Sequence, residues 1–141
     1  MKVTLKKVAA VAFEATAETS GATVSLDGKA DIGGEGRGMR PTELLLSGLG
    51  GCAGIDVAHI LRRQKEPLED LTIEVSGVRT DEPPHRFTSF HLRFVATGDV
   101  NEAKLERAVR LSVEKYCTVR NTLDPEAPVT WEAVKAPTPR G

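Results

Sequence analysis

The stretch LLLSGLGGCAGIDVAHIL, residues Leu44–Leu61, decides how this chain folds. It is nearly uncharged and reaches the length of a membrane span, yet it contains four glycines, one cysteine and, well inside it, Asp56. A carboxylate at bilayer depth costs about 3 kcal/mol, and glycines weaken a helix further. The stretch therefore predicts a helix buried inside protein, and we expect no membrane association.

Length, net charge and cysteine count limit the classes of protein to which this chain can belong. A chain of 141 residues is large enough for one core, and we expect a single domain over residues 1–135 with a flexible tail over 136–141. A net charge of −1 offers no electrostatic footprint for nucleic acid. The N-terminal apolar run, Val8–Phe13, is too short for a signal peptide. Two cysteines do not make a disulfide scaffold, so we expect a cytoplasmic protein with reduced thiols.

The hydrophobic periods outline the elements. Alternating residues predict a first strand near residues 3–15, bulged at Lys6-Lys7, and a second near 22–26, followed by a loop from Gly28 to Arg40. A helix follows from Pro41 to about Gln64, and period two returns at 71–76 and 90–96. A second helix capped by Asn101 precedes a last strand near 129–133. The apolar stripe of this second helix comprises Leu105, Ala108, Val109, Ser112 and Tyr116. The order ββ-α-ββ-α-β indicates an α+β domain.

The first helix poses a packing problem. It is apolar on nearly all sides, so it must be covered on all sides, whereas one modest sheet covers only one face. A second copy of the chain could bury the faces that the sheet leaves exposed, which predicts a homodimer. The glycines then have two open interpretations: they let backbones approach closely around Cys52, or they only relieve crowding between helices.

Three polar side chains of this helix share one face. Cys52, Asp56 and His59 are spaced i, i+4 and i+7, as in a triad or a metal site. The simpler interpretations are a cysteine that packs as a small core residue and a histidine that favours the negative helix end. Because no second Cys/His cluster could complete a coordination sphere, we expect no metal.

Two cysteine motifs carry a resemblance to a known family. GLGGC on the first helix and KYC at the end of the second, around Cys52 and Cys117, are similar to the OsmC/Ohr thiol peroxidases. The likeness continues through RPTELLLSGLGGCAGIDV, HRFTSFHLRF and LSVEKYCTVRNTL, and looks closest to the YhfA-like branch. It implies an OsmC-like fold: an intertwined homodimer whose central helices are sandwiched by antiparallel sheets.

The resemblance also implies a chemistry. Cys52 matches the peroxidatic cysteine and Cys117 the resolving one. A thiolate attacks the O–O bond of an organic hydroperoxide, and the resulting sulfenic acid condenses with the second thiol to a disulfide. An external dithiol of the lipoyl type would reduce that disulfide by exchange. No bound cofactor is implied.

The sequence departs from the family at the groups that support the thiolate. The family's arginine on the first hairpin has no counterpart in AETSGATV. The candidate orienting carboxylate, Glu43, comes one residue later than the family's glutamate, which turns it by about 100° around the helix. A cysteine in apolar surroundings needs a cation to become nucleophilic, and the candidates are Arg37, Arg40 and Arg86.

Two hypotheses from different classes stay open. The cysteine pair favours a peroxidase that reduces organic hydroperoxides. The missing arginine favours a non-catalytic module that binds a small hydrophobic or electrophilic ligand in the dimer pocket, with Cys52 as a contact.

Overall fold

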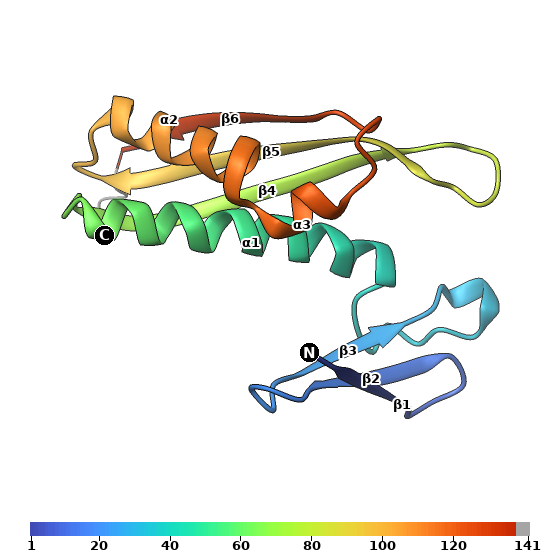
Figure 1. Cartoon of the computed structure of the whole chain (residues 1–141). Coiled ribbons are helices and arrows are strands. Elements are labelled where there is room, and N and C mark those ends of the chain that lie inside the picture. The colour runs from blue at the N-terminus through green and yellow to red at the C-terminus, as the bar shows by residue number, and fades with distance from the viewer. Residues whose placement is uncertain (138–141) are drawn as a thin grey trace. The chain divides into compact units, whose positions relative to one another are not determined.

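The computed structural model describes residues 1–137, which form two compact units (Figure 1). Unit 1 is Met1–Leu45, and unit 2 begins at Leu46. The predicted single domain over residues 1–135 stays a prediction. Of the predicted tail, residues 138–141 lie outside the described part of the chain.

Unit 1 is built on an antiparallel sheet of three strands in the order β1-β2-β3. These are β1 (Val3–Lys7), β2 (Ala12–Ala17) and β3 (Thr23–Asp27). The sequence predicted a single bulged strand near residues 3–15, and this prediction was wrong, because β1 and β2 are separate strands. The N–H of Val8 donates to the carbonyl of Ala12 at 2.9 Å, so the chain reverses after Lys7 and returns as a separate strand.

A buried carboxylate shapes the loop that follows β3. Asp27 accepts hydrogen bonds from the backbone N–H groups of Gly28, Glu35 and Arg37 at 2.8, 2.9 and 3.0 Å. The donors from Arg37 and Glu35 hold the pKa of Asp27 below its usual value, because they stabilise the charged form. The loop, which includes the 3₁₀ turn η1 (Ala30–Ile32), is therefore folded back on the end of β3.

Unit 2 contains a second three-stranded sheet in the order β4-β5-β6. Its strands are β4 (Leu68–Arg79), β5 (Phe87–Gly98) and β6 (Val129–Lys135), as the periods at 71–76, 90–96 and 129–133 predicted. The pairing of β4 with β5 is antiparallel, whereas β5 and β6 run parallel. The prediction of wholly antiparallel sheets was wrong here, because the helical segment between β5 and β6 carries the chain back to the starting end of the sheet.

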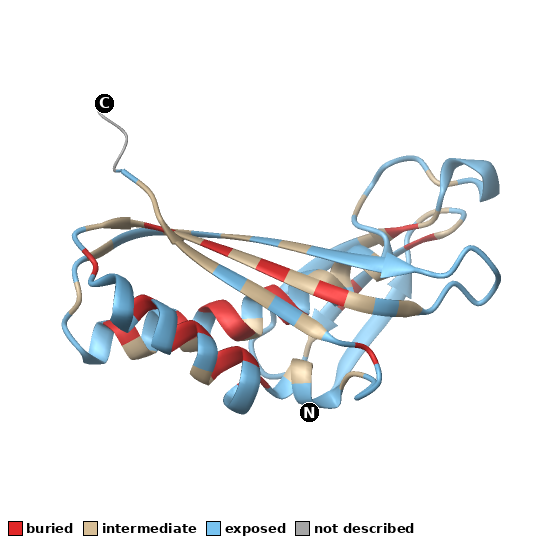
Figure 2. Cartoon of the chain, turned by 90° about the horizontal axis from the view of Figure 1, so that it is seen from above, coloured by how far each residue is buried: buried red, intermediate tan, exposed pale blue. Residues whose placement is uncertain are grey.

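Two long helices lie against one face of this sheet (Figures 1 and 2). They are α1 (Pro41–Arg63), whose first residues belong to unit 1, and α2 (Glu102–Leu111). The helices and the sheet bury one continuous core, seen as red bands in Figure 2. Its fully buried side chains include Leu49, Val57, Leu61, Leu92, Phe94 and Leu105.

Two of the four glycines of α1 lie where the helix packs closely on the sheet. A Cβ at Gly50 would lie 2.5 Å from Cγ2 of Val75, and one at Gly54 would lie 2.4 Å from Cδ1 of Ile73. These glycines therefore let β4 approach the helix, and the predicted relief of crowding applies between helix and strand.

The opposite face of α1 is uncovered in the described chain. Ile55 is 72% exposed, and a Cβ placed on Gly48 or Gly51 would meet nothing within 4 Å. Among the described residues, α1 is the one helix long and apolar enough to cross a membrane. Its buried face packs on the sheet of unit 2 as part of the core.

The segment after α2 departs from the predicted helix. Asn101 caps α2 as expected, accepting a hydrogen bond from the N–H of Lys104 at 3.0 Å. At Ser112 the helix widens into a π-helical turn, η2 (Ser112–Tyr116), and a short helix, α3 (Thr118–Thr122), follows. The wider turn changes the phase of the apolar stripe, so Ser112 is buried as predicted while Tyr116 is 55% exposed.

Candidate active site at two cysteines

Cys52 lies in the middle of α1. Its side chain is half-buried and packs against the core of unit 2. It directly precedes Ala53, which is fully buried against the sheet, and it stands beside the open face that carries Gly48 and Ile55. The thiol is therefore placed at the edge between the core and the uncovered face of the helix.

Cys117 lies at the junction of η2 and α3 and is completely buried, with an exposed fraction of 0%. Its backbone N–H donates to the carbonyl of Ser112 at 2.8 Å, and its Sγ accepts from the N–H of Arg120 at 3.4 Å. Both cysteines are free thiols.

The two thiols lie next to each other. Burial, the largest cause, and the adjacent Cys52 together raise the pKa of the Cys117 thiol from 9.0 to about 11, against the lowering effect of the Arg120 N–H. Cys52 acts both as a hydrogen-bond partner and as a neighbouring charge. Cys117 is therefore a protonated thiol at neutral pH that faces Cys52, and the fold brings together two cysteines far apart in the sequence.

The polar face of α1 does not form the triad that its spacing suggested. Asp56 lies within 3.2 Å of the hydroxyl of Ser112, and His59 is exposed. Over residues 1–137, no group of three or more His, Cys, Asp or Glu side chains could hold a metal ion. Asp56 thus has a structural partner across the core.

The candidate arginines and Glu43 have local partners. Arg37 donates to the carboxylate of Glu35 at 2.9 Å, and Arg86 pairs with Asp124. The N–H of Arg40 donates to Oε1 of Glu43 at 3.0 Å, which is one half of a capping box at the start of α1. The side-chain pairs favour a local role for Arg37 and Arg86, and the bond from the Arg40 backbone favours one for Glu43.

Sequence reasoning missed two residues beside Cys117. Ser112 was assigned only to an apolar stripe, although it contacts both cysteine-bearing segments. Arg120 belongs to none of the sites predicted from the sequence, yet among the described side chains its Nε is buried with no hydrogen-bond partner. The signal for Arg120 was its position three residues after Cys117, where the backbone N–H reaches a capping side chain.

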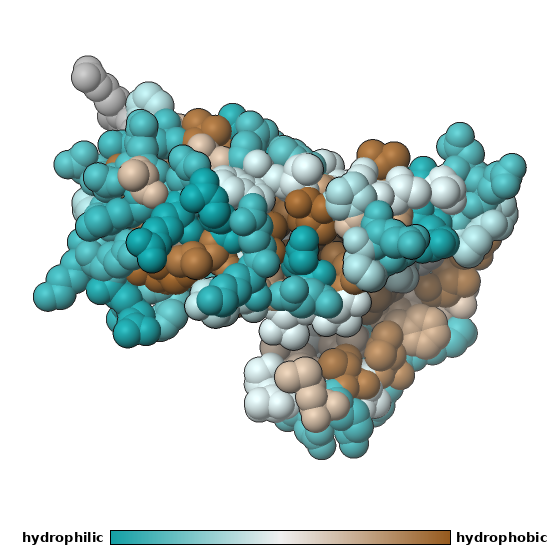
Figure 3. Space-filling model, turned by 45° about the horizontal axis from the view of Figure 1, so that its top comes forward, coloured by the Kyte–Doolittle hydropathy of each residue, from teal (hydrophilic) through white to brown (hydrophobic). Residues whose placement is uncertain are grey.

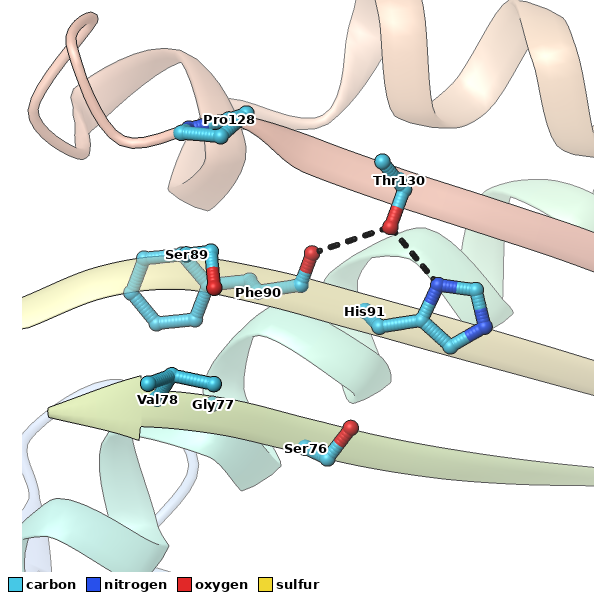
Figure 4. A pocket seen from close by; sticks show the side chains of 8 residues that line it. All are labelled: Ser76, Gly77, Val78, Ser89, Phe90, His91, Pro128 and Thr130. Atoms are coloured by element: carbon cyan, nitrogen blue, oxygen red, sulfur yellow. Dashed lines mark hydrogen bonds between the residues drawn. The ribbon is translucent and has the colours of Figure 1, made fainter.

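A shallow pocket of about 100 Å³ lies on the outer face of the unit 2 sheet (Figure 4). His91 places Nδ1 2.7 Å from Oγ1 of Thr130 and Nε2 3.2 Å from Oε1 of Glu132. These polar groups on neighbouring strands satisfy one another, as cross-strand pairs do. The pocket contains neither cysteine, and the two thiols remain the stronger candidate for chemistry.

The fold and the cysteine pair define a class of protein. The family model described as OsmC-like protein matches residues 34–132, and the chain belongs to this family. Both cysteines lie inside the matched region.

Individual relatives agree with this assignment. Protein YhfA of Escherichia coli K12 is 38% identical over 99 residues, covering 68% of this chain and 74% of YhfA. A hypothetical protein from Aquifex aeolicus VF5 is 33% identical, with a TM-score of 0.78 and 96% of both chains covered. An organic hydroperoxide resistance protein OsmC from Legionella pneumophila shares the fold, with a TM-score of 0.68, 21% identity and 96% and 98% of the two chains covered. The predicted family and α+β fold class are thereby confirmed.

Proposed function

We propose that this protein is a thiol-dependent peroxidase that reduces organic hydroperoxides with Cys52. The single observation that carries the proposal is the neighbouring position of the Cys52 and Cys117 thiols, one half-buried and one buried. Membership of a family that includes proteins named for organic hydroperoxide resistance supports it.

The reaction needs only the two thiols and an external dithiol. The Cys52 thiolate attacks one peroxide oxygen, the O–O bond breaks, and the alcohol leaves after taking up a proton, so that Cys52 becomes a sulfenic acid. The Cys117 sulfur then attacks the sulfenic sulfur, and water leaves as the disulfide forms. A dithiol of the lipoyl or similar type would supply the two electrons that restore both thiols.

A cation beside Cys52 would favour its thiolate. We retain Arg37, Arg40 and Arg86 as candidates, with Glu43 as a candidate orienting carboxylate, and we add Arg120. A guanidinium nitrogen that is buried without a partner costs free energy. The backbone N–H of Arg120 reaches Sγ of Cys117, and an anion formed at the thiols would supply the missing partner if the guanidinium turns toward them.

Two exposed apolar surfaces support a homodimer. The open face of α1 presents Ile55 beside Gly48 and Gly51. On the unit 1 sheet, the register places Val3, Leu5 and Val24 on one face, and Val3 is 52% exposed. Figure 3 shows apolar side chains gathered on the surface of this unit. Contiguous exposed apolar surface commonly marks an interaction site, and a second copy would cover both surfaces.

The alternative is a module that binds a small hydrophobic or electrophilic ligand and uses Cys52 as a contact. The observation in its favour is that Arg37 and Arg86 are paired with carboxylates. Both proposed functions require a free Cys52 thiol, as expected for a protein in the reducing cytoplasm.

Peroxide titration separates the two functions. One equivalent of tert-butyl or cumene hydroperoxide should produce an intrachain Cys52–Cys117 disulfide. Cys117→Ser should stop at a trappable sulfenic acid, and Cys52→Ser should consume no peroxide. Equal, slow consumption by the parent and both variants would exclude the peroxidase and leave the binding module.

A further inference from the structure

The π-helical turn η2 directly precedes Cys117 and begins at Ser112. The bond from the N–H of Cys117 to the carbonyl of Ser112, 2.8 Å long, spans five residues and closes this wide turn. Such turns are rare and concentrate at functional sites. The geometry of η2 therefore connects the backbone of Cys117 to Ser112.

The side chain of Ser112 connects the same turn to α1. Its hydroxyl donates to the carbonyl oxygen of Ala53 at 3.0 Å and lies 3.2 Å from Oδ2 of Asp56. Ala53 is the residue after Cys52, and Ser112 has an exposed fraction of 0%. One buried residue thus contacts the backbone beside Cys52 through its hydroxyl and the backbone of Cys117 through its carbonyl.

We infer that Ser112 is a positioning residue that holds Cys117 in register with Cys52 and thereby favours closure of the disulfide between them. This inference rests on the proposed function for its role in peroxide reduction. The hydroxyl contributes through geometry, because the effective concentration of one thiol at another falls steeply when the two are misplaced by about 1 Å.

The placement of Cys117 relative to Cys52 decides which of two reactions the Cys52 sulfenic acid undergoes. In the first, the Cys117 sulfur attacks it, water leaves and the disulfide forms. In the second, a further hydroperoxide oxidises it to a sulfinic acid and is itself reduced to the alcohol. A well-placed Cys117 favours the first, reversible fate, so Ser112 would protect Cys52 from irreversible oxidation.

The test measures the dithiol–disulfide equilibrium without peroxide. The full chain is equilibrated in glutathione buffers of graded ratio, alkylated and analysed by mass spectrometry. Ser112→Ala should shift the Cys52–Cys117 equilibrium roughly tenfold toward the dithiol, the factor expected for one net hydrogen bond. Ser112→Thr keeps the hydroxyl and should stay within about threefold of the parent.

A matched control separates positioning from general stability. Val113 is 1% exposed and lies in the same turn. Val113→Ala weakens the packing but leaves the Ser112 hydrogen bonds in place, and it should change the equilibrium by less than about threefold. An equal shift in Val113→Ala, or none in Ser112→Ala, would overturn the inference.

If Ser112→Ala does not fold, Asp56→Ala carries the test. It removes one partner of the hydroxyl from the half-buried side of α1 and should move the equilibrium toward the dithiol; a parental equilibrium would overturn the inference. Because glutathione replaces peroxide, the outcome is independent of catalysis. A clear Ser112 effect in a protein that consumes no peroxide would refute the proposed function alone.

Discussion

The raised pKa of Cys117 makes the two thiols chemically unequal. Burial, the largest cause, and the adjacent Cys52 raise this pKa from 9.0 to about 11. Two pH units correspond to a roughly 100-fold smaller thiolate fraction than in an ordinary cysteine at pH 8. Since the thiolate is the reactive form, we expect iodoacetamide to alkylate Cys117 at least 100-fold more slowly in the folded than in the unfolded protein.

The assay follows each thiol separately. The reduced protein is alkylated from pH 7 to 10, digested, and the two cysteine peptides are quantified by mass spectrometry. The protein in denaturant provides the reference rate. Labelling of the folded protein should begin at the half-buried Cys52. A Cys117 rate within tenfold of the unfolded reference would refute the reasoning.

Replacing Cys52 tests the causes of the shift. Cys52→Ser removes the neighbouring negative charge but leaves the burial of Cys117 unchanged. The pKa of Cys117 should therefore fall only in part, because burial is its largest cause. Labelling of Cys117 should accelerate at pH 8 yet remain slower than in denaturant. Full recovery of the unfolded rate would show that burial does not protect this thiol.

The same pKa shift affects folding stability at high pH. The folded-state pKa of Cys117 lies above the unfolded value, so the stabilising contribution is complete below pH 9 and is lost as pH rises toward 11. A shift of two pKa units changes the free energy of unfolding by about 3 kcal/mol at most. In Cys117→Ala, the free energy of unfolding measured with denaturant should no longer fall by this amount between pH 9 and pH 11. An unchanged pH dependence between the parent and Cys117→Ala would contradict the assignment.

Three further predictions concern other parts of the molecule. The lowered pKa of Asp27 implies stability that is present above its unfolded value of 3.8 and lost below it. Asp27→Asn should lower the thermal midpoint at pH 7 and flatten its dependence on pH, and a midpoint equal to that of the parent would exclude this role. Ile55→Glu puts a charge on the open face of α1 and should yield monomers in sedimentation, whereas an unaltered dimer would remove that face from the interface. Arg120→Met should slow alkylation of Cys52 at neutral pH roughly tenfold, with Arg86→Met unchanged as the matched control; the reverse result would identify Arg86 as the cation.

Local patterns in the sequence were sufficient for most elements. The long apolar run predicted α1, the alternation at 71–76 and 90–96 predicted β4 and β5, and Asn101 marked the start of α2. These predictions succeeded because periodicity, capping and burial act over a few residues. The prediction failed between Lys7 and Ala12, where a turn was interpreted as a bulge because the residues Val8–Val11 carry no glycine or proline.

The sequence by itself determined most of the elements, the family motifs around the two cysteines and the absence of a hairpin arginine. Only the tertiary structure decided which residues meet: it places Cys117 beside Cys52, connects both through Ser112, and leaves Nε of Arg120 buried without a partner. It also decided that β6 runs parallel to β5. The physical reason is that hydrophobic periods report burial along one segment, whereas the distance between two thiols depends on how separate segments pack. The π-helical turn that precedes Cys117 has no sequence period of its own, because contacts across the core, such as that of Ser112 with Ala53, stabilise it.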